Sequence, residues 1–193
     1  LGKAMVRGYQ GSSKTAGEAL DLKKEGNIAG CIKHFAGYGA PEGGKDYDNV
    51  ELSERTFRED YLPAYKAAVE EGCAMVMTSF NTLNRIPSSG NKWLMRKVLR
   101  EEMGFDGVVI TDAIGMHSLM DMFGDHIRIS IECIKAGCDV ILGAQGEFID
   151  GVEQAVLNGE IPMSRIDDAC QRILDMKEKI GVFDAPLEEM NKE

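Results

Sequence analysis

The length, composition and charge of the chain restrict both its architecture and its ligands. Its 193 residues are enough to bury a sizeable core, and one domain usually takes roughly 100–200 residues. We therefore expect residues 1–193 to form a single domain. The formal net charge of -10 argues against nucleic acid and against an anionic membrane surface as partners, because both attract basic patches. A neutral or weakly charged substrate suits this charge better.

The cysteines and apolar runs give no sign of a disulfide framework, a metal site or a membrane segment. The five cysteines are odd in number and lack the paired spacing of metal ligands, so we interpret them as reduced core thiols. Reduced thiols favour a cytoplasmic location. No run of ~18 apolar residues is present, and the first residues lack the apolar core of a signal peptide. We expect no metal and no cofactor. The cysteines are Cys31, Cys73, Cys133, Cys138 and Cys170.

Predicted strands and helices alternate along most of the chain. Residues 1–11 are typical of the end of a helix, 12–26 of a loop with a short helix, and 36–52 of a long glycine-rich loop. Strands are predicted at 28–35, 74–80, 108–111 and 138–142. Helices are predicted at 54–71, 92–103, 125–136, 148–158 and 164–180, with Ser53 and Ser164 as N-caps. This alternation indicates parallel strands joined by right-handed crossovers, which is an α/β fold.

Asp112 directly follows the third predicted strand, whose short β-branched run is typical of a parallel strand buried on both faces. Ligands bind beyond the carboxyl ends of parallel strands, so an acidic side chain at this point can be catalytic. It can equally be the N-cap of the next helix. Two other strand ends also deliver polar side chains, at residues 31–35 and 75–81. The three ends would face one pocket.

Four stretches of the sequence resemble glycoside hydrolase family 3, which includes β-glucosidases and β-N-acetylglucosaminidases. They occur in the family's order over nearly the whole chain. The stretches are KHFAGYGAPEGGKDYD, MVMTSFNTLN, NKWLMRKVLREEMGFDGVVITDA and RILDMKEKIGVFD. The resemblance implies that Asp112 matches the family's catalytic nucleophile.

The resemblance also implies a sugar-binding pocket around Asp112. Lys33 and His34 would bond hydroxyl groups of the sugar, and Met77, Ser79 and Phe80 would line the pocket. Considered without the resemblance, Lys33 is better interpreted as a rim lysine and His34 as a core histidine. Many relatives carry Tyr where this chain has Phe80, so one hydrogen bond is lost, and Met77 is better suited to packing than to polar recognition.

The leading functional hypothesis is a fragment of a retaining exo-β-glycosidase that hydrolyses terminal β-D-glucosyl residues. Retention requires a second carboxyl group as general acid and base, and the sequence does not identify it. The N-acetylglucosaminidase branch uses a His-Asp pair, but Tyr38 stands where that histidine would be, which leaves Asp46 and Asp48 in the loop. The residues after Asp112 nevertheless resemble that branch, so N-acetyl-β-glucosaminides remain an alternative substrate. His117 is expected at the surface.

Two further readings compete with a glycosidase. One is a catalytically inactive half-barrel that serves as an assembly or weak sugar-binding module. The other is a phosphate-binding barrel, which the weak Gly143-Ala-Gln-Gly146 signal disfavours.

The resemblance implies a parallel (βα)4 half-barrel of the TIM type, about the fifth to eighth units of the family's barrel. A complete barrel needs ~250 residues. The strands at 28–35 and 138–142 would each expose an unpaired edge, which is costly. We therefore expect the half-barrel to be closed by a second copy or by the missing half.

Overall fold

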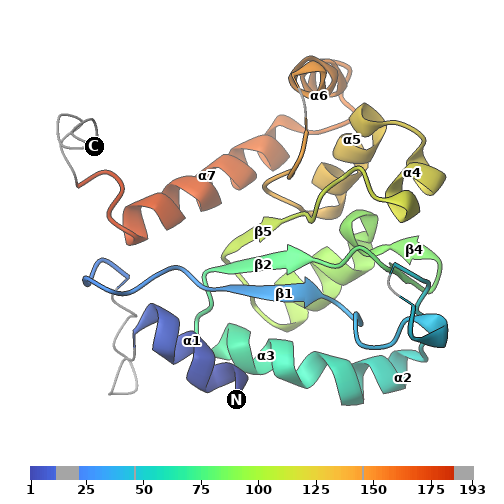
Figure 1. Cartoon of the computed structure of the whole chain (residues 1–193). Helices are drawn as coiled ribbons and strands as arrows, with labels where there is room; N and C mark the ends of the chain where they lie inside the picture. The colour runs from blue at the N-terminus through green and yellow to red at the C-terminus, as the bar shows by residue number, and fades with distance from the viewer. Residues whose placement is uncertain (12–21, 46, 145, 185–193) are drawn as a thin grey trace.

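The computed structural model describes residues 1–11, 22–45, 47–144 and 146–184 (Figure 1). Among these residues, the main sheet has three parallel strands in the order β1-β2-β5. The strands span Cys31–Phe35 (β1), Met75–Thr78 (β2) and Val108–Ile110 (β5). The predicted α/β fold with parallel strands is confirmed.

Helices lie on either side of the three adjacent strands (Figure 1). Helix α1 (Gly2–Gln10) contacts α3 (Leu62–Glu70), which lies against β1. The predicted helix 54–71 is present as three consecutive segments, α2 (Glu54–Thr56), the π-helical η2 (Phe57–Tyr61) and α3. The predicted Ser53 cap is confirmed, because its side chain accepts the N–H of Thr56 at 3.0 Å.

The second half of the chain also follows the predicted helices, with shifts at their ends. A π-helix, η4 (Trp93–Glu102), precedes β5, and α4 (His117–Phe123) and α5 (His126–Ala136) follow it. Helices α6 (Glu147–Leu157) and α7 (Met163–Lys179) complete the described chain. The prediction of Ser164 as a cap is wrong, because Pro162 occupies the N-cap and α7 begins one residue before Ser164.

The fourth predicted strand, 138–142, is reduced to a single parallel bridge between Ile110 and Val140. Its backbone pairs only briefly with β5, and its outer side has no further strand among the described residues. Strand β2 also ends at Thr78, before Ser79 and Phe80, and β1 begins at Cys31, later than predicted.

A short hairpin and two short turns were not predicted. Strands β3 (Thr82–Leu83) and β4 (Ile86–Pro87) form an antiparallel hairpin directly after β2. Short 3-10 turns, η1 (Glu42–Gly44) and η3 (Ser88–Gly90), lie in the loops before α2 and η4. The predicted loop and short helix at 12–26 fall largely outside the described residues. The hairpin and the loops surround the carboxyl end of the sheet, where the predicted site lies.

The core lies between the sheet and the helices that cover it. Phe35, Val76 and Val109 from the strands pack with Leu94 and Leu99 from η4, and all five are fully buried. A smaller cluster joins α5 and α6. The buried members of this cluster are Ile131, Ile134, Ala155 and Ile161. The strand ends are therefore held by a packed scaffold on the helix side.

The buried Gln10 connects α1 to the starts of two strands. Its side-chain oxygen accepts the N–H groups of Gly30 and Ala74, both at 2.8 Å, and its amide donates to the carbonyl of Gly72 at 2.8 Å. A fully buried amide must be satisfied in this way. Gln10 thus sets where β1 and β2 begin relative to each other.

No helix in the described ranges has both the length and the apolar character needed to cross a membrane.

Candidate active site

The structure brings Asp112 and His34 together at the carboxyl ends of β5 and β1. The His34 Nε2 atom lies 3.5 Å from Asp112 Oδ2, and both side chains are 19% exposed. Residues 78 positions apart in the sequence meet because β1, β2 and β5 run parallel and end at the same edge. A partly open carboxylate beside an imidazole can bind and act on a ligand there.

Asp112 does not cap the helix that follows it. The N-cap of α4 is Met116, and the Asp112 carboxylate instead accepts the N–H of its neighbour Ala113 at 2.7 Å. The N–H of Asp112 donates to the hydroxyl of Thr78 at 3.3 Å, and that hydroxyl bonds Ser89 at 2.6 Å. The structure thereby excludes one of the two readings that the sequence left open. One carboxylate oxygen is oriented by the backbone, and the other faces His34.

A tyrosine of helix α3, Tyr65, forms a hydrogen bond with the backbone of His34. The Tyr65 hydroxyl donates to the His34 carbonyl at 2.5 Å, and its ring packs edge-on against Phe35 with centroids 5.1 Å apart. Burial raises the pKa of Tyr65 to about 12. The hydroxyl therefore stays protonated, and able to donate, throughout the neutral and mildly alkaline range.

The burial of Tyr65 predicts a specific loss of stability at alkaline pH. The pKa of an unfolded tyrosine is about 10, so the stabilisation is fully present below pH 10 and is lost as pH rises toward 12. The loss is on the order of 2–3 kcal/mol. We expect the free energy of unfolding of Tyr65→Phe, measured by urea at pH 9 to 12, to fall by less than that of the parent.

The matched control is Tyr9→Phe, because Tyr9 is half-exposed on α1. It should keep the pH dependence of the parent. Equal pH dependence in the parent and in Tyr65→Phe would contradict the assignment of this titration to Tyr65.

Phe80 lies at the centre of a group of rings beside His34. Its centroid is 4.5 Å from that of Tyr38, 4.5 Å from that of Tyr47 and 5.4 Å from that of His34. Such distances are typical of favourable aromatic pairs. Phe80 is itself buried. Phe80 therefore forms a buried wall of the site, and the rings of His34, Tyr38 and Tyr47 pack around it.

The other predicted binding residues are placed differently from one another. Lys33 is exposed on β1, and the pairing of β1 with β2 is irregular between Ile32 and Phe35. The Lys33–His34 and Phe35–Ala36 peptide bonds are cis. Met77 is half-buried beside Ile110 on the adjacent strand. These positions keep Lys33 and Met77 near the rim.

Ser79 is fully buried, and its side chain is occupied by the protein. Its hydroxyl donates to the side-chain oxygen of Asn81, and its N–H donates to the carbonyl of Phe35 at 2.6 Å. In this arrangement Ser79 shapes the turn after β2. Direct contact between Ser79 and a sugar stays a prediction.

Of the two loop aspartates that the sequence left as candidates, only Asp48 lies among the described residues. Asp48 accepts the N–H of Asn49 at 2.8 Å, and Asp46 lies outside the described residues. His117 is exposed, as predicted. Across the part of the chain that the structure describes, no three His, Cys, Asp or Glu side chains are grouped to hold a metal ion.

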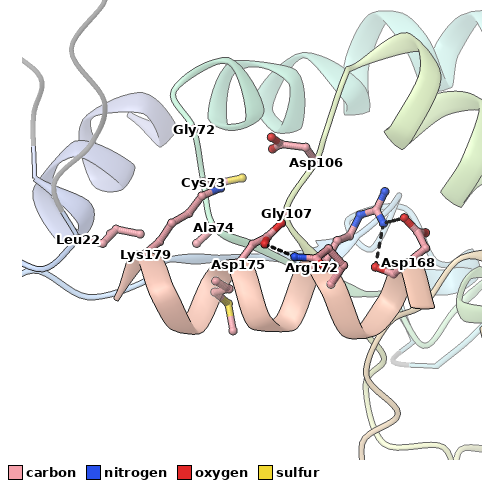
Figure 2. Close-up of a pocket in the computed structure, with 12 residues that line it drawn as sticks. Leu22, Gly72, Cys73, Ala74, Asp106, Gly107, Asp168, Arg172, Asp175 and Lys179 are labelled. Atoms are coloured by element: carbon pink, nitrogen blue, oxygen red, sulfur yellow. Dashed lines mark hydrogen bonds and ion pairs between the residues drawn. The ribbon is translucent and has the colours of Figure 1, made fainter. Parts of the chain in front are cut away.

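A cavity lies at the opposite end of the sheet from Asp112. It has a volume of about 520 Å³ and lies between helix α7 and the segments that precede β2 and β5 (Figure 2). Gly107 lines it just before β5, whereas Asp112 follows the other end of that strand. In parallel α/β folds, catalysis is found at the carboxyl ends of the strands. The volume of this cavity therefore does not identify it as the active site.

The rings around Phe80 were the part of the site that sequence reasoning missed. The sequence pointed to Tyr38 only because it stands where one branch of the family has a histidine. Tyr47 was not among the predicted site residues. A signal was available, because both tyrosines lie in the same glycine-rich loop that resembles the family. Their convergence on Phe80 needed the tertiary fold.

Comparisons with known proteins agree on one family. Residues 1–176 match the model of the glycosyl hydrolase family 3 N-terminal domain. The chain is 32% identical over 193 residues to a periplasmic beta-glucosidase of Salmonella typhimurium, covering 96% of this chain and 23% of that protein. It is 33% identical over 203 residues to a beta-xylosidase of Formosa agariphila, covering 100% of this chain and 27% of that protein.

A solved structure gives the same result for the fold. The beta-glucosidase of Listeria innocua in complex with isofagomine matches with a TM-score of 0.86 and 36% identity, over 100% of this chain and 26% of that one. Our chain thus spans about a quarter of the length of the proteins that it matches.

Proposed function

Because the chain belongs to glycosyl hydrolase family 3, we propose that it carries the nucleophile side of a retaining β-glycosidase active site, with Asp112 as the nucleophile. The observation that supports this most is the placement of Asp112. Its carboxylate lies at the carboxyl end of β5, is partly open to solvent, and does not cap the next helix.

The geometry gives the two carboxylate oxygens of Asp112 different roles. The backbone N–H of Ala113 orients Oδ1, which leaves Oδ2 toward His34 and toward an entering sugar. Attack of the carboxylate on the anomeric carbon breaks the glycosidic bond and forms a covalent glycosyl-enzyme, which water then hydrolyses. Lys33 and His34 would bond sugar hydroxyls, and Met77, Ser79 and Phe80 would form the pocket.

We infer that the general acid is a residue outside the site described around Asp112. A retaining glycosidase needs a second carboxyl group about 5–5.5 Å from the nucleophile to protonate the leaving oxygen. The proteins that this chain matches are about four times longer, so there is ample chain elsewhere to supply the acid.

The substrate class that the comparisons favour is a terminal β-linked glucosyl residue. The relatives are named as beta-glucosidases and beta-xylosidases. The beta-glucosidase of Listeria innocua has also been solved in complex with glucose. These names favour a β-glucoside over an N-acetyl-β-glucosaminide for this chain.

Covalent labelling tests the proposal directly. A 2-fluoroglucosyl donor with a good leaving group needs little acid assistance, so labelling is expected even where the general acid is absent. We expect the intact mass to rise by one 2-fluoroglucosyl group and peptide mapping to place it on Asp112. A folded chain that takes no label would favour the alternative of an inactive sugar-binding or assembly module.

We propose, in addition, that the open edge of β1 is covered in the active protein. The outer side of β1 has no strand beside it among the described residues, and Ile28, just before it, is largely exposed. Unpaired edges of this kind favour association. The occupant would be a second copy of the chain or the rest of the barrel.

Sedimentation velocity of the purified chain tests the first of these occupants. We expect a self-associated species at micromolar concentration, because only its own copies are then present to cover the edge. A stable monomer would contradict self-association and assign the edge to the rest of the barrel. Monomeric behaviour after adding a charge at the edge, as in Ile28→Lys, would support pairing through β1.

A further inference from the structure

The backbone N–H of Asp112 is bonded to a side chain of the neighbouring strand. It donates to the hydroxyl of Thr78, the last residue of β2, at 3.3 Å. The last pair of residues in register between β2 and β5 is Met77 with Ile110, so Asp112 lies beyond the regular ladder. The Thr78 side chain thus continues the contact between the two strands as far as the proposed nucleophile.

Thr78 lies between the two residues that face each other across the site. In the register of the sheet it pairs with Phe35, which directly follows His34 on β1. On its other side it bonds Asp112, whose Oδ2 atom is 3.5 Å from His34 Nε2. Thr78 is fully buried, so its side chain is out of reach of a sugar in the pocket. Any effect of its hydroxyl on the reaction must therefore pass through Asp112 or His34.

The Thr78 hydroxyl is itself held by a second buried hydroxyl. Thr78 Oγ1 lies 2.6 Å from Oγ of Ser89, which is 2% exposed. A hydroxyl has one proton to donate and two lone pairs that accept, so Thr78 can bond Ser89 and still accept the N–H of Asp112. The two hydroxyls therefore form a short hydrogen-bond chain that ends at the backbone of Asp112.

The other end of this chain is anchored by the segments around η3, which contains Ser89. The Ser89 carbonyl accepts the thiol of Cys138, which lies just after α5, at 3.4 Å. The preceding Ser88 donates its N–H and its hydroxyl to the carbonyl of Asn81, at 3.2 and 3.0 Å. Contacts with both neighbouring segments therefore fix the Ser89 hydroxyl to the packed scaffold.

We propose that Thr78 and Ser89 are positioning residues, whose paired hydroxyls set where the Asp112 carboxylate lies relative to the sugar beside His34. The inference rests on the proposed function, because it takes Asp112 as the nucleophile. Attack requires reacting atoms about 3–3.5 Å apart, and a misplacement of about 1 Å can cost on the order of 10²-fold in rate. Loss of the hydroxyl pair should therefore slow the covalent step and leave sugar binding unchanged.

Labelling kinetics with the 2-fluoroglucosyl donor test this role. A series of donor concentrations gives the saturating rate of labelling and the apparent affinity for the donor separately. In variants that circular dichroism shows to be folded, we expect Thr78→Val and Ser89→Ala to lower the saturating rate by about 10- to 100-fold with unchanged affinity. Thr78→Ser should restore most of the rate, because it keeps the hydroxyl.

Ser130→Ala is the matched control for the loss of a buried hydroxyl. Ser130 is fully buried, and its hydroxyl donates to the carbonyl of His126 within α5 at 2.7 Å. Its removal costs the protein a buried hydrogen bond that is not connected to Asp112. Ser130→Ala should therefore keep the labelling rate of the parent.

The ring signals of His34 report the position of the carboxylate without any reaction. The chain has three histidines, so their ring signals are readily assigned by NMR at one fixed pH. We expect Thr78→Val to move the His34 signals toward those of Asp112→Ala. Thr78→Ser and Ser130→Ala should keep the His34 signals of the parent.

The outcomes separate this inference from the proposed function. Labelling of Thr78→Val at the parent's rate, a loss that Thr78→Ser does not restore, or a loss of donor affinity alone overturns the inference and leaves Asp112 as the nucleophile. Ser89→Ala gives the same decision if Thr78→Val does not fold. If the parent takes no label, the proposed function fails and the His34 signals decide: their movement in the variant supports the positioning role, and unchanged signals overturn it.

Discussion

Under the proposed function, Asp112→Ala is expected to lower β-glucoside turnover by on the order of 10⁴-fold or more, the usual scale for removing a catalytic nucleophile. Without the carboxylate no covalent glycosyl-enzyme can form, and binding by the remaining pocket cannot replace that step. The fold should persist, because Asp112 is partly exposed and its carboxylate bonds only the neighbouring Ala113 N–H and faces His34. Stopped assays with an aryl β-glucoside measure the loss, and circular dichroism checks the fold.

Asp106→Ala provides the matched control for the nucleophile. Asp106 is exposed and lies just before β5, whereas Asp112 lies just after it. Its removal should leave turnover and 2-fluoroglucosyl labelling unchanged. If Asp112→Ala were labelled as readily as the parent, the nucleophile would have to be another residue.

Asp139→Ala is expected to destabilise the protein by about 3–5 kcal/mol, the range found when one partner of a buried ion pair is removed. Asp139 is fully buried and joins two arginines, accepting from Arg100 Nη2 at 2.7 Å and from Arg165 Nη2 at 2.5 Å. It also accepts the N–H of Val109 at 2.9 Å. Without the carboxylate, Arg100 would lose the ion pair it makes with Asp139, and Arg165 would keep only its ion pair with Asp168.

The surroundings of the two arginines make this loss difficult to relieve. Arg165 is 6% exposed and also donates to the carbonyls of Ile134 and Cys138. Burial lowers the pKa of Arg100, against the opposing effect of Asp139. Neither side chain can turn outward without breaking bonds that hold the loops around β5. The network therefore fixes the strand that carries Asp112.

Urea unfolding of Asp139→Ala beside Glu101→Ala measures this contribution. Glu101 pairs with Lys97 on the exposed face of η4, so its removal should cost no more than about 0.5 kcal/mol. A loss below about 1 kcal/mol for Asp139→Ala would show that the arginines find other partners or water, which the buried-pair argument does not allow.

Much of the architecture was determined by local sequence pattern. The short β-branched run before Asp112, the alternation of apolar strands with amphipathic helices and the Ser53 cap each predict an element that the structure contains. These signals are local, because the side chains that point to one face are set by the period of the backbone. The same patterns placed polar residues at strand ends, and the family resemblance singled out Asp112, His34 and Phe80.

Other features depend on partners that local pattern does not reveal. The apolar run at 138–142 has strand-like composition, yet among the described residues it forms only one bridge, with Ile110. Asp139 is charged but fully buried, because Arg100 and Arg165 arrive from distant helices to neutralise it.

The candidate site divides in the same way. The sequence by itself determined which strand end carries the carboxylate, because a strand and the residue after it are contiguous. Only the tertiary structure decided that His34 lies 3.5 Å from Asp112, that Ser79 faces inward, and that Tyr38 and Tyr47 enclose Phe80. Contacts between residues far apart in the chain form only when parallel strands end at one edge and the loops pack over it.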